Sequence, residues 1–352
     1  MAETVYEILV GDQMSERRVR PDHWTWMDDG DVEFRVITLP WARGRDRIFQ
    51  IARLLPRLRK ARVVVTTEYF MTWSVCVLFF LLRVKTPHAA IGLNISGKSI
   101  APRNRLLRRL NNRAFKEVDL AVVASRPEAR QFHEMYDLPL ERFAFAHWSF
   151  DLPSSEGAAI QLPDRPFFCL IGRNNRDHAT FCEAIRDLDA DGIIVASAPS
   201  DFEVPPNVRF LANIPLADCI RIIQGSVANV ILVNDASRGA GHITIVTAAH
   251  CARPQIISDV DTASDYFVAG EHALVVPLHD PAATREAMRR LLDDPARADE
   301  MGRASAEHAG RWLTHATRTE RLAAILRSWW TTGTFDPVDP DWARARGAPK
   351  SL

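Results

Sequence analysis

The sequence contains few cysteines, and their arrangement excludes a disulfide framework or a cysteine-ligated metal. Five occur among 352 residues, without a CxxC pair and without the spacing of metal ligands. They are Cys76, Cys169, Cys182, Cys219 and Cys251. Several lie inside apolar runs, which indicates buried thiols in a reducing cytoplasm.

The chain also lacks segments typical of export or membrane insertion. Its first residues, MAETVYEILVGDQ, have no basic start followed by an apolar core, so no signal peptide is expected. The apolar run MTWSVCVLFFLLRV, residues 71–84, is shorter than the roughly 20 residues that span a hydrocarbon core. We interpret it as a helix buried against a sheet, with an element dipping into a membrane as the alternative. We therefore expect a cytoplasmic protein, with the inner face of the membrane as a further location.

Composition excludes a disordered or fibrous chain, since 47% of residues are apolar and 25% are charged. The net charge is zero but unevenly placed. Residues 1–150 carry 24 Lys and Arg against 17 Asp and Glu, whereas residues 151–352 carry 20 against 27. The asymmetry indicates two units with different partners, although ordinary surface variation explains it equally well.

Short runs rich in Val and Ile alternate with helical patterns along most of the chain. This alternation is typical of βαβ units that build a parallel sheet. It stops at DLPSSEGAAIQLPDRP, residues 151–166, which has the composition of a linker, and then restarts. We predict an α/β chain of two tandem Rossmann-like, doubly wound domains with a cleft between them. Their predicted limits are 1–150 for the first domain, 151–166 for the linker, 167–328 for the second domain and 329–352 for a tail that returns to the first.

Two loops of the second domain have the features of an anion site, because ligands of open α/β sheets bind at strand carboxyl ends. In LIGRNNRDHATFCEAI, residues 170–185, a predicted strand ends at Gly172, and Arg173 and Arg176 follow it. Guanidinium groups present paired donors to phosphate oxygens, so the pair suits a diphosphate. Solvated loop arginines are the alternative.

The second loop lies in NDASRGAGHITIVTAAHCARP, residues 234–254. Gly239 and Gly241 allow close backbone approach, and a helix beginning near His242 and Ile243 would direct free N–H groups at a phosphate. The glycines could equally be simple turn formers. Together the two loops favour a diphosphate site.

The segment from GRNNRD to PARADEMG, within residues 167–310, resembles the donor domain of GT-B glycosyltransferases of family 4 (glycosyl transferases group 1). The order and spacing of GRNNRD, the helix from His242 and YFVAGEHALVVPLHD carry the resemblance. It implies two Rossmann-like domains that bind a nucleotide-sugar donor of UDP or GDP type without a metal or other cofactor. The diphosphate would lie at the two loops, and the base near Asn213 and Ile214.

The sequence departs from the family pattern of two glutamates spaced E-x7-E. Thr247 stands where the second glutamate would contact the ribose, and Gly239 stands at the first. The carboxylates that usually contact the donor are therefore either missing or located elsewhere in the chain. This departure leaves two alternatives open: a donor bound in another way at Thr247, or a loss of activity.

The first domain would bind the acceptor, and its polar residues at predicted strand ends are Asp12, Glu68, Asn94 and Ser96. Glu68 is the candidate catalytic base if transfer inverts the sugar configuration, whereas retention needs no protein base. A capping or salt-bridged glutamate is the alternative.

The segment Arg103–Lys116, RNRLLRRLNNRAFK, places cations around a narrow stripe of Leu106, Leu110 and Ala114. This pattern suits peripheral contact with anionic lipid and hence a lipid-linked acceptor, or else a solvated basic face. We find no motif for nucleic-acid binding.

These observations predict a hexosyltransferase-type enzyme (EC 2.4) of bacterial polysaccharide or glycoconjugate biosynthesis. It would move sugar from a nucleotide diphosphate to a carbohydrate or lipid-linked acceptor. A catalytically silent binding protein and a nucleotide-sugar epimerase of the same fold are the alternatives.

Overall fold

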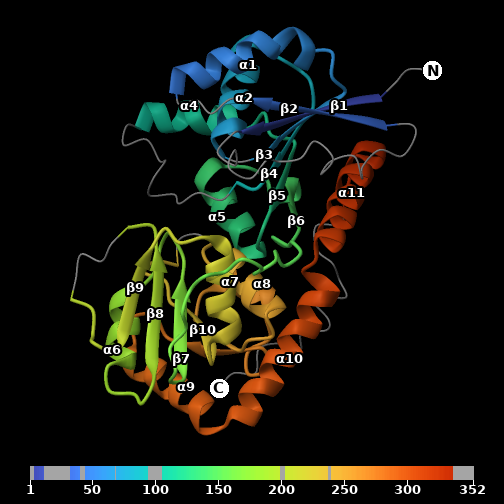
Figure 1. Ribbon diagram of the computed structural model, residues 1–352. Coiled ribbons are helices and arrows are strands. Elements are labelled where there is room, and N and C mark those ends of the chain that lie inside the picture. Colours follow the sequence, from blue (N-terminus) through green and yellow to red (C-terminus); the bar gives the residue numbers. More distant parts are fainter. Residues whose placement is uncertain are drawn as a thin grey trace. The chain divides into compact units, whose positions relative to one another are not determined.

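The computed structural model describes residues 4–11, 32–39, 44–67, 69–93, 105–198, 203–236 and 239–335. The chain divides into two compact units. Unit 1 comprises residues 1–146 and 319–352, and unit 2 comprises residues 147–318. Both are α/β units built on a parallel sheet, as predicted from the alternation of strands and helices (Figure 1).

Unit 1 is built on a six-stranded sheet with the strand order β2-β1-β3-β4-β5-β6. Its strands are β1 Thr4–Gly11, β2 Val32–Leu39, β3 Val63–Thr67, β4 His88–Ile91, β5 Leu120–Val123 and β6 Phe143–Phe145. Its helices are α1 Gly44–Leu58, α2 Tyr69–Leu82, α4 Arg105–Phe115 and α5 Arg126–Tyr136, with a 3-10 turn η3 at Leu140–Arg142. Every strand pair in this sheet is parallel.

Alternating side chains of the strands build two cores in unit 1. Val63 and Val65 point to one face, where they pack with Leu322 and Ile325 of α11, His315–Thr332. Val64 points to the opposite face, which α1, α2, α4 and α5 cover. Trp329 and Trp330, the first two aromatic residues of the predicted tail, belong to α11 and pack against the same core.

Sequence reasoning placed no helix at α5, Arg126–Tyr136. Its local chemistry is nevertheless that of a helix start. Ser125 and Glu128 form a capping box, in which the Glu128 carboxylate accepts from the Ser125 backbone N–H at 3.0 Å. Asp137 ends the helix in the left-handed conformation.

Unit 2 is built on a six-stranded parallel sheet with the order β12-β11-β10-β7-β8-β9. Its strands are β7 Phe167–Ile171, β8 Asp191–Ala196, β9 Val208–Ala212, β10 Ala228–Ile231, β11 Gln255–Ser258 and β12 Ala273–Val276. Its helices are α6 His178–Ile185, α7 Leu216–Gly225, α8 His242–His250, α9 Pro281–Asp293 and α10 Pro295–Trp312, with a 3-10 segment η4 at Asp261–Tyr266. Helices α6 and α9 pack on one face, and α7 and α8 on the other.

The segment predicted as a linker packs on unit 2. The backbone N–H groups of Ala159 and Ile160 donate to the Asp218 carboxylate at 2.8 and 3.0 Å. Ile160 and Leu162 pack against the core under α7. Its Pro, Ser and Gly content therefore corresponds to an irregular backbone, which these hydrogen bonds and packing contacts hold against unit 2.

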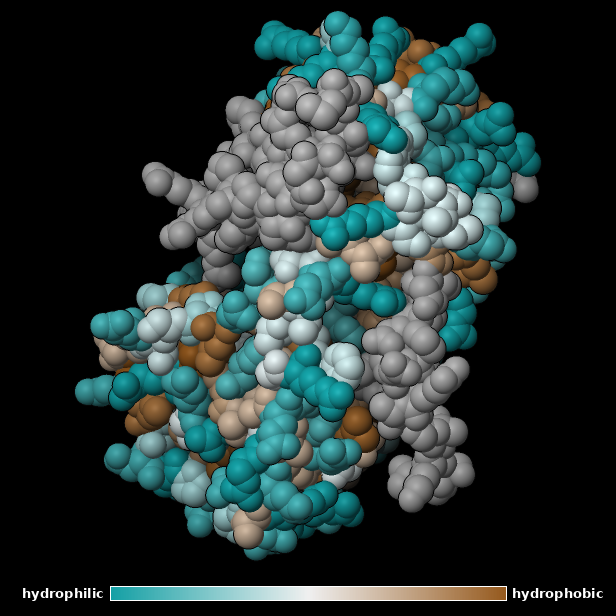
Figure 2. Space-filling view, turned by 90° about the vertical axis from the view of Figure 1, so that its right-hand side faces the viewer, coloured by the Kyte–Doolittle hydropathy of each residue, from teal (hydrophilic) through white to brown (hydrophobic). Residues whose placement is uncertain are grey.

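Helix α2 explains the longest apolar run, since most of its side chains are buried in unit 1. No helix in the described part of the chain combines the length and apolarity needed to cross a bilayer. Figure 2 shows one face of the molecule, on which hydrophilic residues predominate and hydrophobic ones are scattered. All five cysteines are free thiols.

Candidate functional site: the switch point of the second sheet

The order of strands in unit 2 reverses between β7 and β10. The chain runs outward from β7 through β8 to β9, then returns to add β10, β11 and β12 on the other side of β7. Ligands of open α/β sheets bind at such a switch point, outside the carboxyl ends of the strands. The loop after β7, residues 172–177, and the loop after β10, residues 232–241, both begin there. These are the two loops that the sequence singled out.

Three hydrogen bonds join the two loops into one structure. The backbone N–H of Asp177 donates to the Leu232 carbonyl at 3.0 Å. The Asn234 side-chain amide donates to the Arg176 carbonyl at 2.8 Å, and the Asn175 amide donates to the Asp235 carbonyl at 2.7 Å. Asn175 is in the left-handed region with φ 54°, which asparagine tolerates. The asparagines therefore fix the loops relative to each other.

The Arg176 side chain lies inside this structure, not in solvent. It is 8% exposed, and its guanidinium donates to the carbonyls of Ile171 and Asn174 at 3.3 and 3.1 Å. A third bond goes to the Thr244 hydroxyl, in the first turn of α8, at 3.3 Å. Gly172 makes room for the group, because a Cβ there would lie 2.3 Å from Arg176 Nε. Arg176 was predicted as a loop side chain open to a diphosphate; the structure shows a brace within the loop.

Arg173 is exposed, and its backbone carbonyl accepts from the Ser197 hydroxyl at 3.3 Å. Its guanidinium is therefore the one of the two that extends into solvent at the loop. Arg176 contributes differently, by adding a buried positive charge beside the positive end of the α8 dipole. Both charges favour an anion at this edge of the sheet.

Helix α8 begins with uncapped backbone N–H groups. Gly241, its N-cap, has φ 95° and no side chain to accept from them. A Cβ at Gly241 would also lie 2.8 Å from Ile231 Cγ2, so glycine is required for conformation and for space. Ile243 in the first turn is 56% exposed. A helix start of this kind can hold a phosphate through its N–H groups.

The His242 side chain turns away from the helix start into the core. It is 4% exposed, its Nε2–H donates to the Thr262 carbonyl at 2.8 Å, and its ring stacks on Tyr266 at 4.4 Å between centroids. Its predicted contribution to an anion site is therefore restricted to the backbone N–H.

All three predicted nucleoside contacts are engaged in the fold. Asn213 has φ 53°, and its amide donates to the Ser197 carbonyl at 2.7 Å, which fixes the loops after β8 and β9 together. Thr247 is 7% exposed, and its hydroxyl donates to the Ile243 carbonyl one turn earlier at 2.7 Å. Ile214 packs partly against the core under α7. The Thr247 hydroxyl is thus used by its own helix.

Sequence reasoning missed a histidine–carboxylate pair at the same edge. The Asp177 carboxylate caps α6 by accepting from the Thr180 N–H at 3.0 Å and the Thr180 hydroxyl at 2.7 Å. His279, in the loop between β12 and α9, lies 2.7 Å from the same carboxylate through Nδ1. An ionised carboxylate only accepts, so Nδ1 carries a proton, and Nε2 of this exposed ring does not take part in the bond. Only the packing of α6 against α9 brings the two residues together, and no local motif announces it.

The acceptor residues predicted in unit 1 fall outside the described part of the chain. These residues are Asp12, Glu68, Asn94 and Ser96. The strands before them show where the switch point of this sheet is. Its order reverses between β1 and β3, whose register pairs Val10 with Thr67. The roles of these four residues stay predictions.

Among the residues described, no group of three or more His, Cys, Asp and Glu is placed to hold a metal ion.

Comparisons with known proteins show which family and fold the chain resembles. Residues 173–326 match the family described as glycosyl transferase-like. A D-rhamnosyltransferase, WbpZ of Pseudomonas aeruginosa, is 32% identical over 148 residues, which are 39% of each chain. A D-inositol 3-phosphate glycosyltransferase of Corynebacterium diphtheriae is 30% identical over 118 residues, which are 34% of this chain and 27% of that protein. The match thus spans about two fifths or less of these relatives.

Solved structures resemble nearly the whole chain. Sucrose-phosphate synthase of Thermosynechococcus elongatus has a TM-score of 0.71 at 13% identity, over 92% of this chain and 99% of that one. The Anabaena protein Alr3699/HepE, solved with UDP and glucose, has a TM-score of 0.68 at 13% identity over the same shares. The fold is GT-B, as the sequence predicted. The predicted resemblance to group 1 glycosyltransferases is likewise confirmed.

Proposed function

We propose that the protein is a glycosyltransferase of the hexosyltransferase type (EC 2.4) that uses a nucleotide diphosphate-sugar as donor. The observation that carries the proposal is the switch point of unit 2. There the exposed Arg173, the buried charge of Arg176 and the uncapped start of α8 meet at one edge. An anion with two adjacent phosphates matches this combination of guanidinium and backbone donors.

The chemistry required of this edge is stabilisation of the departing nucleotide diphosphate. Negative charge develops on that group when the bond to the sugar breaks, and fixed donors and helix dipoles stabilise it without reorganisation. Such a site needs no metal or other cofactor. A UDP- or GDP-type donor is our choice, with the base near Asn213 and Ile214. The neighbour Alr3699/HepE was solved with UDP-glucose as well as with UDP.

We assign the acceptor to unit 1, with Glu68 as the base if the reaction inverts and Asp12, Asn94 and Ser96 as acceptor contacts. We further propose a carbohydrate or lipid-linked acceptor in bacterial polysaccharide or glycoconjugate biosynthesis, with work in the cytoplasm at the inner face of the membrane. The bacterial glycosyltransferases that the chain resembles support the transfer of sugar itself. The missing glutamates at Thr247 and Gly239 favour one rival, a binding protein that no longer transfers sugar.

Calorimetric titration with UDP, GDP and their sugars tests the donor site. The Arg173→Ala variant should weaken binding of the preferred nucleotide about ten- to a hundredfold, because a hydrogen bond to a charged group contributes roughly 1.5–3 kcal/mol. The matched control is Arg186→Ala, which removes a half-exposed arginine at the far end of α6. Equal affinity in both variants would remove the diphosphate from this loop.

Nucleotide release separates transfer from its rivals. Release from the nucleotide-sugar that depends on an added acceptor indicates transfer. Change at the sugar ring without acceptor indicates epimerisation. Tight binding without either reaction, across lipid-linked and free sugar acceptors, would indicate the silent binding protein.

A further inference from the structure

The outer side of the helices that cover unit 1 combines exposed apolar residues with a dense set of cations. Helices α1, α2 and α4 lie side by side over one face of the sheet, with α2 packed against both of the others (Figure 1). Each turns its buried side to the sheet or its neighbours, so the exposed residues of all three point away from the sheet. We call these exposed residues the outer helical face.

Helix α4 shows the pattern most clearly. Its buried side carries Ala114 and Phe115, and Asn111 accepts from the Trp73 indole N–H at 2.5 Å. Its exposed side carries Leu106, 63% exposed, and Leu110, 50% exposed. The sequence placed these leucines on an apolar stripe with Ala114; the structure separates them from Ala114 and exposes them beside arginines.

The exposed side of α4 is also cationic. Arg108, Arg109 and Arg113 are exposed, and the helix contains no acidic residue. Arg109 and Arg113 lie on the same stripe as the two leucines, at positions i+3 and i+7 from Leu106. Leucines projecting from among arginines are the arrangement of a helix that lies in the plane of a membrane surface.

Helix α1 extends this surface on the other side of α2. Its exposed stripe follows the helical spacing i, i+4, i+8 through Arg45, Phe49 and Arg53, and Phe49 is 66% exposed. Asp46 is its one acidic residue. The apolar and cationic groups therefore occur on two separate helices of the same layer.

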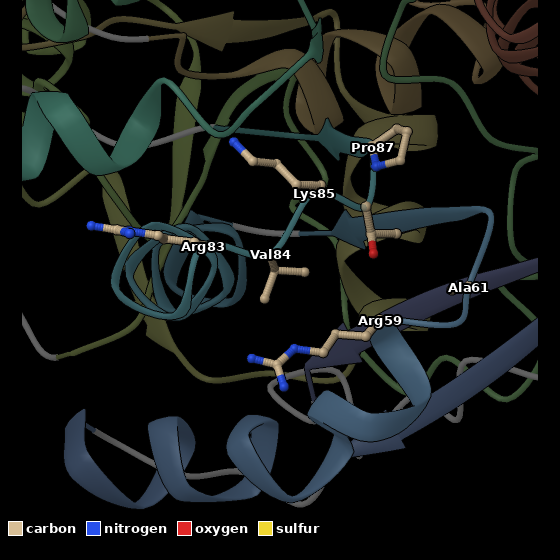
Figure 3. Close-up of a pocket in the computed structure, with 7 residues that line it drawn as sticks. Arg59, Ala61, Arg83, Val84, Lys85 and Pro87 are labelled. Atoms are coloured by element: carbon tan, nitrogen blue, oxygen red, sulfur yellow. The ribbon is translucent and has the colours of Figure 1, made fainter.

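Helix α2 contributes apolar groups between them. Phe70 is 46% exposed and Leu81 is 66% exposed, at the two ends of a stripe with the spacing i, i+7, i+11 that includes Val77. After Leu81 and Leu82 the chain turns through Arg83 and Lys85. These two cations and Arg59 line a hollow of about 380 Å³ beside the end of α2, and no acidic side chain lines it (Figure 3).

We propose that the outer helical face binds the surface of an anionic membrane, with the exposed leucines and phenylalanines at the level of the acyl boundary and the cations on lipid phosphates. The inference is independent of the donor site, because none of these residues belongs to unit 2. Charge complementarity selects the occupant. Against a purely polar acidic partner, the exposed apolar residues of the outer helical face would stay in water. A bilayer surface accepts both the apolar residues and the cations.

Co-sedimentation with lipid vesicles tests the proposal on the whole 352-residue chain. The wild type should sediment with vesicles of phosphatidylcholine and phosphatidylglycerol, and should stay in solution with vesicles of phosphatidylcholine alone. Leu106→Ser combined with Leu110→Ser should weaken binding at least about tenfold, since two partly inserted side chains are lost. Arg109→Glu combined with Arg113→Glu should weaken it further and flatten its dependence on salt, since each charge near the surface contributes about fivefold.

Two matched controls distinguish binding through the outer helical face from a general effect of losing an exposed charge or an exposed apolar side chain. Leu140→Ser removes a leucine that is 46% exposed in the 3-10 turn η3, and Arg289→Glu reverses a half-exposed arginine on α9 of unit 2. Both should bind vesicles like the wild type. Unfolding temperature and nucleotide affinity should be unchanged in all four variants, so that a failure here is distinct from a failure at the donor site.

Several outcomes would overturn the proposal. One is wild-type protein that stays in solution with phosphatidylglycerol vesicles at low salt. Another is leucine variants that bind as the wild type does. A third is retention on polyglutamate as strong as on vesicles and insensitive to the leucine substitutions, which would identify an acidic polymer as the partner.

Discussion

At the residue scale, Arg176 and Thr247 have structural roles that limit how their side chains can contact a ligand. Burying a guanidinium is costly unless its donors are used, and Arg176 uses them on the carbonyls of Ile171 and Asn174 and on the Thr244 hydroxyl of α8. Removing it would therefore loosen the loop as well as remove a charge, which is why Arg173 is the sharper probe of the ligand. Thr247 is constrained in the same way by its bond to Ile243.

Thr247→Glu should lower the unfolding temperature without tightening nucleotide binding. The side chain is 7% exposed, so a longer, charged group must be desolvated or must displace its neighbours. We expect a loss of roughly 1–3 kcal/mol in the free energy of unfolding, measured by urea denaturation.

Thr247→Val is the matched control, since it keeps the shape of the side chain and removes only the hydroxyl. It should cost about 1 kcal/mol or less, because its partner carbonyl still accepts from the helix. A glutamate variant as stable as the wild type that binds nucleotide more tightly would show that position 247 faces the ribose.

At the scale of elements, the approach of α10 to the end of α8 decides how the two helices pack. Gly302 of α10 lies so close to the turn after α8 that a Cβ would be 2.2 Å from the Ala252 carbonyl oxygen. Backbone atoms cannot move aside as a flexible side chain can. Gly310 lies in the same helix, and a Cβ there would have nothing within 4 Å.

The two glycines therefore predict opposite effects of the same substitution. Gly302→Ala should destabilise the protein by roughly 1–3 kcal/mol, since either helix must shift. Gly310→Ala should stabilise it by about 1 kcal/mol, because alanine loses less backbone entropy in a helix than glycine does. Thermal unfolding of the two variants beside the wild type measures both, and similar shifts of the same sign would contradict the packing of α10.

At the scale of the whole molecule, unit 1 contains a buried histidine that makes its stability depend on pH. His88 is completely buried, and its Nε2 lies 2.8 Å from the Thr66 hydroxyl. Burial lowers the pKa of His88 from 6.5 to about 3, because the interior disfavours the charged ring. The folded state therefore holds it neutral where the unfolded state takes up a proton.

The free energy of unfolding should accordingly fall as pH drops below about 6.5. This histidine gives a slope of about 1.4 kcal/mol per pH unit, hence about 2 kcal/mol lost by about pH 5. Burial raises the pKa of Asp119 and Glu117, which acts in the opposite direction, so the histidine's contribution between about pH 6.5 and 5 is the difference between the wild type and a variant that lacks it. Urea denaturation across this window, followed in the His88→Asn variant as well, measures the slope. The same slope in both proteins would assign the effect to another group.

The sequence by itself determined the class of fold and singled out the two loops that meet at the switch point of the second sheet. Val- and Ile-rich runs between helical patterns specify buried parallel strands, and the positions of Gly172 and Gly241 mark where strands give way to helices. Those are local or periodic properties, so they can be read along the chain. The order of the strands, and hence the switch point between β7 and β10, followed only from the structure.

Side-chain direction was decided by tertiary structure alone. Arg173 and Arg176 are equivalent in a loop sequence, yet one extends into solvent and the other braces the loop, because Gly172 and Thr244 leave room and a partner for only one guanidinium. The pairing of His279 with Asp177 joins residues 102 positions apart through the contact of α6 with α9. Packing between distant elements sets both arrangements, and no pattern of neighbouring residues encodes it.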